Sequence, residues 1–208
     1  MEKIILIGFG GHAHSVIDSI IQKNEYEIAG YVDIEKHADY LNLKYLGTDS
    51  DLKNIFDSGI KNAVICIGYM GKSDNRENIY YNIKSIGFNL PVIVDNSAII
   101  AKNVKIDEGT FVGKGTVINA NANIGKMCII NTKSLIEHDC EIGNFTHVAV
   151  SACICGGVKV GKSSFIGANS SIIQYLNIGN KVFIGAGILV TNDINDNSRI
   201  TFGKNING

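Results

Sequence analysis

Isoleucine or valine recurs at every sixth position from residue 100 to residue 190, mostly separated by polar or small residues. An amphipathic helix would require spacings of three and four, and a half-buried strand would require strict alternation. A period of six instead predicts a hexapeptide parallel β-helix, in which three short flat strands make one coil. The positions of the series are Ile100, Ile106, Val112, Ile118, Ile124, Ile130, Ile136, Ile142, Val148, Ile154, Val160, Ile166, Ile172, Ile178, Ile184 and Val190.

Each aliphatic residue of this series is expected to point into the prism and to stack on its equivalents eighteen residues away along the chain. The residue two positions earlier is mostly small or branched, as at Thr110 and Cys128, which suits a second inward position. The residue directly after the aliphatic one is often Gly, Ala, Asp or Asn, as at Gly113. Because such residues tolerate left-handed backbone, we expect this position to form the tight corner.

The first part of the chain shows a different pattern, in which short apolar runs alternate with helical periods. The expected strands are 3–7, 26–32 and 63–67, and the expected helices are 15–22 and 75–86. This alternation predicts a small Rossmann-like parallel sheet. Pro91, the chain's single proline, marks the passage into the β-helix. We therefore expect a nucleotide-binding domain over residues 1–94 and a β-helix domain over residues 95–208.

A glycine turn follows the first expected strand. Its sequence, Gly8-Phe-Gly-Gly-His-Ala13, is close to the dinucleotide fingerprint, and Asp33 ends the second strand where a ribose-binding acid would stand. Such a turn lets a phosphate approach the N-terminus of a helix. It is also compatible with a turn that binds nothing, whereas NAD would need a larger half. We expect a nucleotide-sugar site, with His12 as a ligand contact or simply a polar residue at the helix start.

Composition narrows the classes of function. The 208 residues carry a net charge of −1 without a basic stripe, which argues against nucleic-acid binding. No apolar stretch approaches the length of a membrane span, and the short apolar start does not fit a signal peptide, so the cytoplasm is the expected location. The five cysteines are odd in number and lack a CxxC pair, so we expect them to be reduced and structural.

Two histidines, His138 and His147, fall within the predicted β-helix. His138 lies two positions after an inward isoleucine, at a corner, between Glu137 and Asp139. A carboxylate beside an imidazole fixes its tautomer and stabilises the imidazolium, which suits a general base. The alternative is a solvated corner with acids nearby by chance. His147 precedes an inward valine and should point outward on a flat, where a surface or subunit contact is also consistent.

The segment Asn131–His147, which reads NTKSLIEHDCEIGNFTH, and the turn Ile7–Ala13 together resemble the sialic-acid O-acetyltransferase and nucleotide-amino-sugar N-acetyltransferase family. The similarity is strongest to bacterial UDP-4-amino-sugar acetyltransferases of the bacillosamine pathway. The resemblance implies a left-handed β-helix, acetyl-CoA as cosubstrate, no metal, and a homotrimer with active sites between subunits. One departure is the C-terminal segment Phe202–Gly208, which lacks the proline common in the family.

The resemblance also implies roles for individual positions. His138 matches the catalytic base, and Asp139 matches the carboxylate that raises its basicity. The positions that match acetyl-CoA contacts are His147, Gly156, Ala168 and Ala186. The positions that match nucleotide-sugar contacts are Gly10, Gly11, His12, Asp33, Ile34 and Gly68.

These observations predict an acetyl-CoA-dependent N-acetyltransferase that acts on the C4 amine of a nucleotide-linked 4-amino-4,6-dideoxy sugar for surface glycan biosynthesis. O-acetylation of sialic acid by the same residues is the main alternative, and a non-catalytic β-helix scaffold is the second. A zinc enzyme of the carbonic-anhydrase type needs three histidine ligands from adjacent coils. The predicted β-helix contains two histidines, which argues against this class of enzyme.

Overall fold

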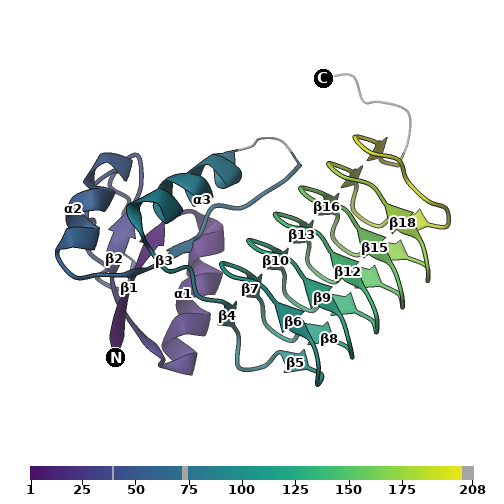
Figure 1. Ribbon diagram of the computed structural model, residues 1–208, viewed down its shortest axis with the longest axis horizontal. Helices are drawn as coiled ribbons and strands as arrows, with labels where there is room; N and C mark the ends of the chain where they lie inside the picture. The colour runs from purple at the N-terminus through teal and green to yellow at the C-terminus, as the bar shows by residue number, and fades with distance from the viewer. Residues whose placement is uncertain (39, 72–74, 203–208) are drawn as a thin grey trace. The chain divides into compact units, whose positions relative to one another are not determined.

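The computed structural model describes residues 1–38, 40–71 and 75–202, and the chain divides into two compact units (Figure 1). The first unit comprises Met1–Gly68 and Ser73–Asn96, and the second comprises Tyr69–Lys72 and Ser97–Gly208. An α/β unit is thus followed by a parallel β-helix, which confirms the predicted fold class. The residues from 203 onward, where the sequence departs from the family pattern, lie outside the described ranges.

The first unit is built on a three-stranded parallel sheet with the order β2-β1-β3. The strands of this sheet are β1 (Glu2–Ile7), β2 (Tyr26–Val32) and β3 (Asn62–Ile65), and the short β4 (Ile93–Val94) is not part of it. The helices of the unit are α1 (Gly11–Lys23), α2 (Leu52–Asp57) and α3 (Asn75–Ile86), with a 3-10 turn η1 (Asp49–Asp51). Because the three strands are parallel, the turns that follow them lie at one edge of the sheet.

Helix α1 begins at Gly11, four residues before the start expected from the hydrophobic period. Its apolar residues Val16, Ile17 and Ile20 face the core, and the helix ends at Lys23, after which Asn24 adopts left-handed backbone. In the first turn only Ala13 is buried, so the apolar period is clear only from Val16 onward and marks the packed face rather than the start. The helix α2 was not expected from the sequence, since its six residues are too short to show a period.

The second unit is a β-helix with three parallel sheets, one for each flat of the prism (Figure 1). The aromatic flat contains β7 (Phe111–Val112), β10 (Ile129–Ile130), β13 (His147–Val148), β16 (Phe165–Ile166), β19 (Phe183–Ile184) and β21 (Arg199–Ile200). The apolar flat contains β5 (Ile99–Ile100), β8 (Val117–Ile118), β11 (Leu135–Ile136), β14 (Cys153–Ile154), β17 (Ser171–Ile172) and β20 (Leu189–Val190). The polar flat contains β6 (Lys105–Ile106), β9 (Asn123–Ile124), β12 (Glu141–Ile142), β15 (Lys159–Val160) and β18 (Asn177–Ile178).

The predicted register of eighteen residues holds between neighbouring coils, as in the pair Ile136 and Ile154. From Val112 to Val190 every aliphatic residue of the series is buried. Ile100 is an exception, with 37% of its surface exposed, because the first coil has a β-helix neighbour on one side only. The small residues two positions earlier are also inward and buried from Thr110 onward, as predicted.

The expectation for the corners is wrong in its position. Left-handed backbone occurs three residues after the aliphatic residue, as at Asn103, Asp139 and Tyr175, and not directly after it. The glycines directly after the aliphatic residues have another cause. A Cβ at Gly143 would lie 2.6 Å from the Lys162 nitrogen of the next coil, so glycine is required there by the close approach of two backbones.

The last coil is two residues shorter than the others. Ile178 pairs with Ile194, and Ile184 pairs with Ile200, so the spacing falls from eighteen to sixteen. Carboxylate oxygens of Asp193 and Asp196 accept hydrogen bonds of 2.8 Å from the backbone nitrogens sixteen residues earlier, at residues 177 and 180. Asp193 thus replaces a backbone carbonyl, since the Lys159 nitrogen one coil earlier donates to the Leu176 carbonyl. Asp196 instead continues a side-chain contact of the regular coils, in which the Lys162 nitrogen donates to the Asn180 side-chain oxygen.

Candidate functional site

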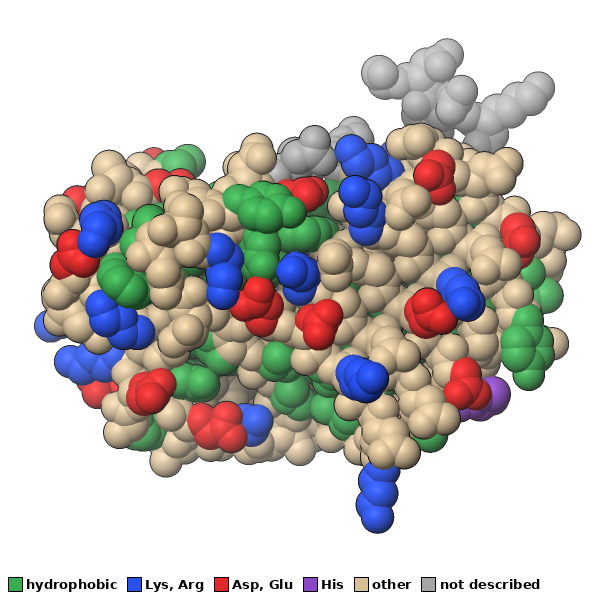
Figure 2. Space-filling view, in the orientation of Figure 1, with side chains coloured by type: hydrophobic (Ala, Val, Ile, Leu, Met, Phe, Trp, Pro, Cys, Tyr) green, Lys and Arg blue, Asp and Glu red, His purple; other side chains and the backbone are tan. Residues whose placement is uncertain are grey.

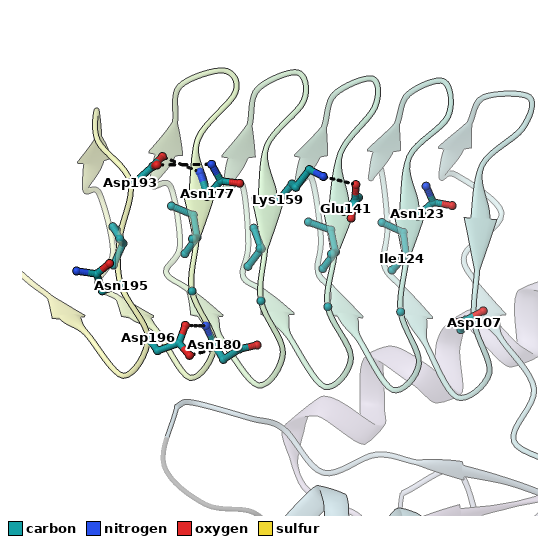
Figure 3. A pocket seen from close by; sticks show the side chains of 18 of the residues that line it. Asp107, Asn123, Ile124, Glu141, Lys159, Asn177, Asn180, Asp193, Asn195 and Asp196 are labelled. Carbon is teal, nitrogen blue, oxygen red and sulfur yellow. Dashed lines mark hydrogen bonds and ion pairs between the residues drawn. The ribbon is translucent and has the colours of Figure 1, made fainter.

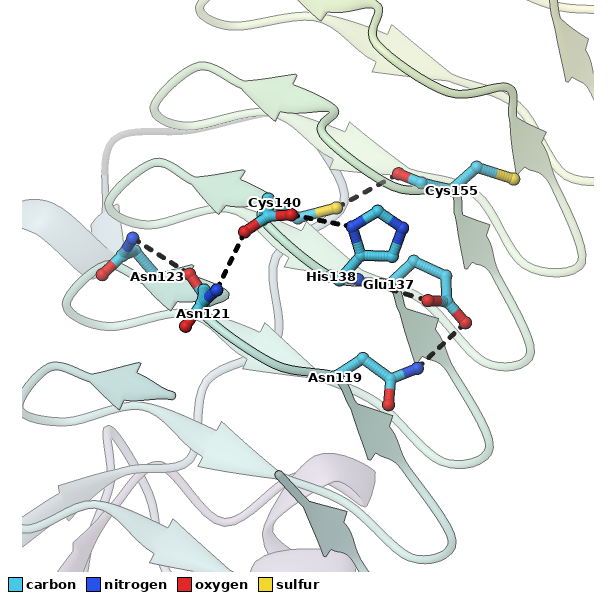
Figure 4. Close-up of polar contacts among 8 residues, drawn as sticks. Asn119, Asn121, Asn123, Glu137, His138, Cys140 and Cys155 are labelled. Atoms are coloured by element: carbon cyan, nitrogen blue, oxygen red, sulfur yellow. Dashed lines mark hydrogen bonds and ion pairs between the residues drawn. The ribbon is translucent and has the colours of Figure 1, made fainter. Parts of the chain in front are cut away.

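His138 lies at the corner between the apolar flat and the polar flat, in the turn that joins β11 to β12 (Figure 4). About half of its side chain is exposed, so the ring is outside the stacked interior. The next residue, Asp139, has left-handed backbone, and its Oδ2 lies 2.8 Å from Nδ1 of His138. Asparagine and aspartate are the residues that adopt this backbone most readily after glycine, so the corner both accepts Asp139 and directs its carboxylate.

The contacts of Asp139 determine which nitrogen of His138 can act as a base. The hydrogen bond from His138, and then the amide of Asn121 at 3.1 Å, hold the pKa of the Asp139 carboxyl below its usual value. An ionised carboxylate only accepts hydrogen bonds, so Nδ1 of His138 carries the proton. The lone pair is therefore on Nε2, and no described group forms a hydrogen bond with that atom.

Glu137, the other acid beside His138, is held in a different direction. Its Oε1 accepts a hydrogen bond of 2.9 Å from the amide of Asn119, and its Oε2 accepts one of 3.2 Å from the backbone nitrogen of His138. Glu137 therefore braces the turn, and Asp139 orients the imidazole. Both asparagines lie eighteen residues before their acid, so the repeat period was a signal that could have identified them.

Gly156 lies one coil beyond His138 in the same corner. A Cβ at this position would come within 2.6 Å of Nε2 and 2.7 Å of Cε1 of His138, so only glycine leaves room for the imidazole where it stands. The Gly156 carbonyl accepts a bond of 2.9 Å from the Tyr175 nitrogen. No described group accepts a hydrogen bond from the Gly156 N–H, which leaves a backbone donor beside the imidazole.

The cysteines near this corner have packing roles. Cys140 is fully buried, its thiol lies 3.1 Å from the Cys155 carbonyl, and burial raises its pKa to about 11. A thiol with a raised pKa is a poor nucleophile at neutral pH. All five cysteines are free, and among the described residues no cluster of three or more His, Cys, Asp or Glu side chains could hold a metal.

His147 projects outward from the aromatic flat, as expected, but it is covered. Only 9% of its surface is exposed. Its Nδ1 lies 2.6 Å from the carbonyl oxygen of Tyr69, and its Nε2 lies 3.3 Å from the amide nitrogen of Asn131. No sequence pattern indicated the contact with Tyr69. A contact between His147 and acetyl-CoA remains a prediction.

Ala168 and Ala186 stack in the corner that follows the aromatic flat, where the Gly187 nitrogen donates a bond of 2.8 Å to the Ala168 carbonyl. The apolar flat separates this corner from the corner of His138. One β-helix therefore does not bring the predicted CoA positions Ala168 and Ala186 to the predicted base. It does bring Gly156 to His138.

In the first unit, Gly10, Gly11 and Gly68 share an unusual property. A Cβ on any of them would meet no atom within 4 Å, and none of them has a positive φ. The fold therefore does not require glycine at these positions. Gly8 is different, because it has φ +88° and its Cβ would lie 2.6 Å from the Ile67 side chain. Gly8 shapes the turn, and the other three leave open space at the carboxyl edge of the sheet.

The N-terminus of α1 lies beside that open space. Gly10 is the N-cap, no side chain caps it, and the first turn contains no acidic residue. His12 lies in this first turn and is half-buried. Backbone N–H groups at the start of a thirteen-residue helix favour an anion such as a phosphate.

Asp33 fastens the glycine turn to the end of β2. Its Oδ2 accepts a bond of 2.7 Å from the Phe9 nitrogen and lies 3.0 Å from Nε2 of His37, while Oδ1 accepts a bond from the Ile34 nitrogen. The Ile34 side chain is 88% exposed. His37 belongs to this cluster although the sequence did not identify it. It lies beside a hollow of about 550 Å³ that is also lined by Lys36 and Lys44.

A hollow of the second unit runs along the polar flat and has a volume of about 930 Å³ (Figure 3). Its floor includes stacked glycines, and its side chains pair with one another, as Lys159 does with Glu141 at 2.9 Å. None of the predicted site residues lines it. Across the face shown in Figure 2, acidic and basic side chains are mixed. No helix among the described residues is long and apolar enough to cross a membrane.

Comparisons with known proteins place the chain among sugar-modifying enzymes. The PglD N-terminal domain family matches residues 3–83. The GDP-perosamine N-acetyltransferase of Caulobacter crescentus, solved as a histidine-to-alanine variant with CoA and GDP-perosamine, is 30% identical, with a TM-score of 0.90. That comparison covers 100% of this chain and 98% of the other.

Two further structures are similar to the chain over most of its length. The acetyltransferase domain of PglB from Neisseria gonorrhoeae is 25% identical over 96% of both chains, with a TM-score of 0.86, and it was also solved with acetyl coenzyme A. WeeI from Acinetobacter baumannii is 21% identical over 96% of both chains, with a TM-score of 0.75, which supports the fold.

Proposed function

Because the chain belongs to the family of acetyl-CoA-dependent nucleotide-sugar N-acetyltransferases with a PglD-type N-terminal domain, we propose that it acetylates the C4 amine of a nucleotide-linked 4-amino-4,6-dideoxy sugar. The product would serve surface glycan biosynthesis. The observation that carries the proposal is the corner at His138, where Asp139 holds one nitrogen of the imidazole and Gly156 borders the other.

The first unit would hold the nucleotide diphosphate. Gly10, Gly11 and Gly68 leave open space at the sheet edge, and the uncapped N-terminus of α1 offers N–H groups to phosphate. Asp33 and the exposed Ile34 would contact the nucleoside beside them, and His12 would contact the phosphate or sugar. Two similar structures from Caulobacter crescentus were solved in complex with CoA and GDP-perosamine, which supports a nucleotide-linked sugar as the acceptor.

The second unit would carry out the transfer. Nε2 of His138 accepts a proton from the sugar amine as the nitrogen attacks the thioester carbonyl carbon of acetyl-CoA. The N–H of Gly156 donates to the oxygen that becomes negative, an effect typically worth about 3 kcal/mol. The C–S bond then breaks, and the proton passes from His138 to the departing CoA sulfur. Asp139 stabilises the imidazolium between these two steps.

We propose that the enzyme is a homotrimer whose active sites lie between subunits. The apolar flat presents a column of outward side chains that includes Ile99 and Leu189, which are 65% and 64% exposed. On one side this flat meets the corner of His138, and on the other it meets the corner of Ala168 and Ala186. Pairing of apolar flats around a threefold axis would bring the base of one subunit to the CoA-binding corner of its neighbour.

The test is a thiol-release assay with acetyl-CoA and a panel of acceptors. The panel contains UDP-, dTDP- and GDP-linked 4-amino-4,6-dideoxy sugars, the matching sugars with a C4 hydroxyl, and sialic acid. We expect release with an amino sugar and not with its hydroxyl counterpart. Release with sialic acid alone would support the O-acetyltransferase instead. Absence of release together with absence of CoA binding by calorimetry would support a scaffold.

A further inference from the structure

A short segment of the chain, Tyr69–Gly71, is packed on the aromatic flat and belongs to the β-helix unit. We call it the strap. It directly follows Gly68, the last residue of that part of the first unit and a predicted contact of the nucleotide sugar. A segment so far from residue 97 in sequence has no role in the coil repeat, so its attachment to the flat needs its own explanation.

His147 makes the first attachment. Because the Tyr69 carbonyl can only accept, the 2.6 Å contact requires that Nδ1 of His147 carry the hydrogen. Nε2 then accepts from the Asn131 amide at 3.3 Å, and the Asn131 oxygen is fixed by a 2.8 Å bond from the Thr132 nitrogen. The network holds His147 in one tautomer and one orientation, with its donor directed at the strap.

Two further contacts attach the strap independently of His147. The hydroxyl of Tyr69 donates a hydrogen bond of 2.7 Å to the Ser163 carbonyl. Gly71 has φ +71°, and a Cβ there would lie 2.6 Å from Cδ2 of Phe183. The Phe183 ring is itself held, since it stacks on Phe165 with centroids 5.1 Å apart and lies 3.8 Å from the Arg199 guanidinium carbon. The strap therefore packs on an aromatic ring that is held by its neighbours, and this ring leaves room only for glycine at position 71.

We propose that His147 is a positioning residue that holds the strap and, through it, the Gly68 end of the nucleotide-sugar site. The inference rests on the proposed function. Consecutive Cα atoms are about 3.8 Å apart, so fixing Tyr69 restricts Gly68 to a small volume. A loop that is ordered before binding reduces the entropy cost of binding. His147 thereby affects the affinity for the acceptor sugar nucleotide, a role different from contact with acetyl-CoA.

Two substitutions of His147 separate the effect of its hydrogen bond to the strap from the effect of its ring packing. His147→Phe keeps a ring against Phe165 but removes the donor, whereas His147→Asn places an amide nitrogen where Nδ1 stood. Tyr69→Phe removes the second attachment. Tyr81→Phe, an exposed tyrosine of α3, is the matched control. The first readout is amide hydrogen exchange of the peptide that contains Gly68–Gly71, measured on the full chain without substrates.

We expect exchange in that peptide to be roughly three- to tenfold faster in His147→Phe and Tyr69→Phe, as for the loss of one neutral hydrogen bond. His147→Asn and Tyr81→Phe should exchange like the wild type. In steady-state kinetics, with the most reactive acceptor of the thiol-release panel, the KM for that acceptor should rise by a similar factor in the first two variants. The KM for acetyl-CoA should change by less than about twofold.

Unchanged exchange in His147→Phe would overturn the inference, and so would a rise in the KM for acetyl-CoA with the acceptor KM unaffected. Failure of the proposed function looks different, because the wild type would then release no thiol with any acceptor. In that case the positioning role falls as well, while the exchange data still report whether His147 holds the strap.

Discussion

Nε2 of His138 and the Cα of Gly156 face each other across one coil step, so closely that a methyl group on Gly156 would lie 2.6 Å from the ring nitrogen. The glycine therefore fixes where the base can stand and keeps an N–H beside it. The relationship follows from the repeat, because Gly156 is eighteen residues after His138.

The first prediction concerns Gly156. Gly156→Ala should displace the imidazole and lower kcat by roughly tenfold or more, because misplacement of a catalytic group by a fraction of an ångström is costly. Thermal melting should remain close to that of the wild type, because the corner is solvent-exposed at His138. Lys102→Ala, an exposed change in the same corner column, is the control and should leave kcat unaltered. Unaltered kcat in Gly156→Ala would show that the ring position does not matter.

The second prediction concerns the pKa of Asp139, measured by NMR titration of its carboxyl group. Because His138 is the largest cause of the lowered pKa and Asn121 the next, His138→Ala should raise it toward about 3.9, and Asn121→Ala should raise it less. A lowered folded-state pKa stabilises the fold above the unfolded value, and this stabilisation is lost as pH falls through the folded value. The stabilisation from the Asp139 contact should thus be complete above about pH 4 and be lost as the pH falls below that value through the lower pKa of the folded state. Equal shifts in both variants would contradict this order.

The third prediction concerns the glycine turn after β1. It separates the glycines that are needed for ligand binding from those that are needed for folding. Gly11→Ala should stabilise α1 by about 0.5–1 kcal/mol, since alanine is the better helix former and its Cβ meets nothing. It should also weaken binding of the nucleotide sugar, measured by calorimetry. Gly8→Ala, in contrast, should lower the melting temperature, because it forces a Cβ against Ile67 at φ +88°. Undiminished nucleotide binding in Gly11→Ala would argue against a phosphate site there.

The fourth prediction concerns the stacked interior. Ile136 is fully buried, so Ile136→Ala should lower the free energy of unfolding by about 2–5 kcal/mol. Ile100 occupies the equivalent place in the first coil but is 37% exposed, and Ile100→Ala should cost clearly less. Denaturant unfolding of both variants measures the difference. Similar losses would mean that the first coil is as well packed as the middle of the column.

Much of the β-helix could be predicted because each coil repeats the same physical requirement. The period identified the inward residues, and it places Asn121 beside Asp139 through the same eighteen-residue step. The left-handed corner was predicted at the wrong position, because glycine occurs at two positions of the repeat for different reasons. Directly after the aliphatic residue, as at Gly143, glycine admits a neighbouring backbone, whereas three residues after it, as at Gly157, glycine adopts positive φ. Composition alone does not distinguish the two.

The remaining parts of the site depend on contacts that no local pattern records. The strap meets His147 across 78 residues of sequence, and His37 joins Asp33 through an irregular loop. Neither segment has a period, so sequence spacing could not reveal its partner. The turn after β1 was identified because its glycines are local to one strand and one helix.

The most direct test of the account measures kcat of His138→Ala and His138→Asn at saturating acetyl-CoA and acceptor, with His14→Ala as a matched control on an exposed histidine of α1. If Nε2 of His138 removes the proton from the amine, kcat should fall by about 10²-fold or more in both variants and stay unaltered in the control. A kcat close to that of the wild type in His138→Ala would contradict the central claim.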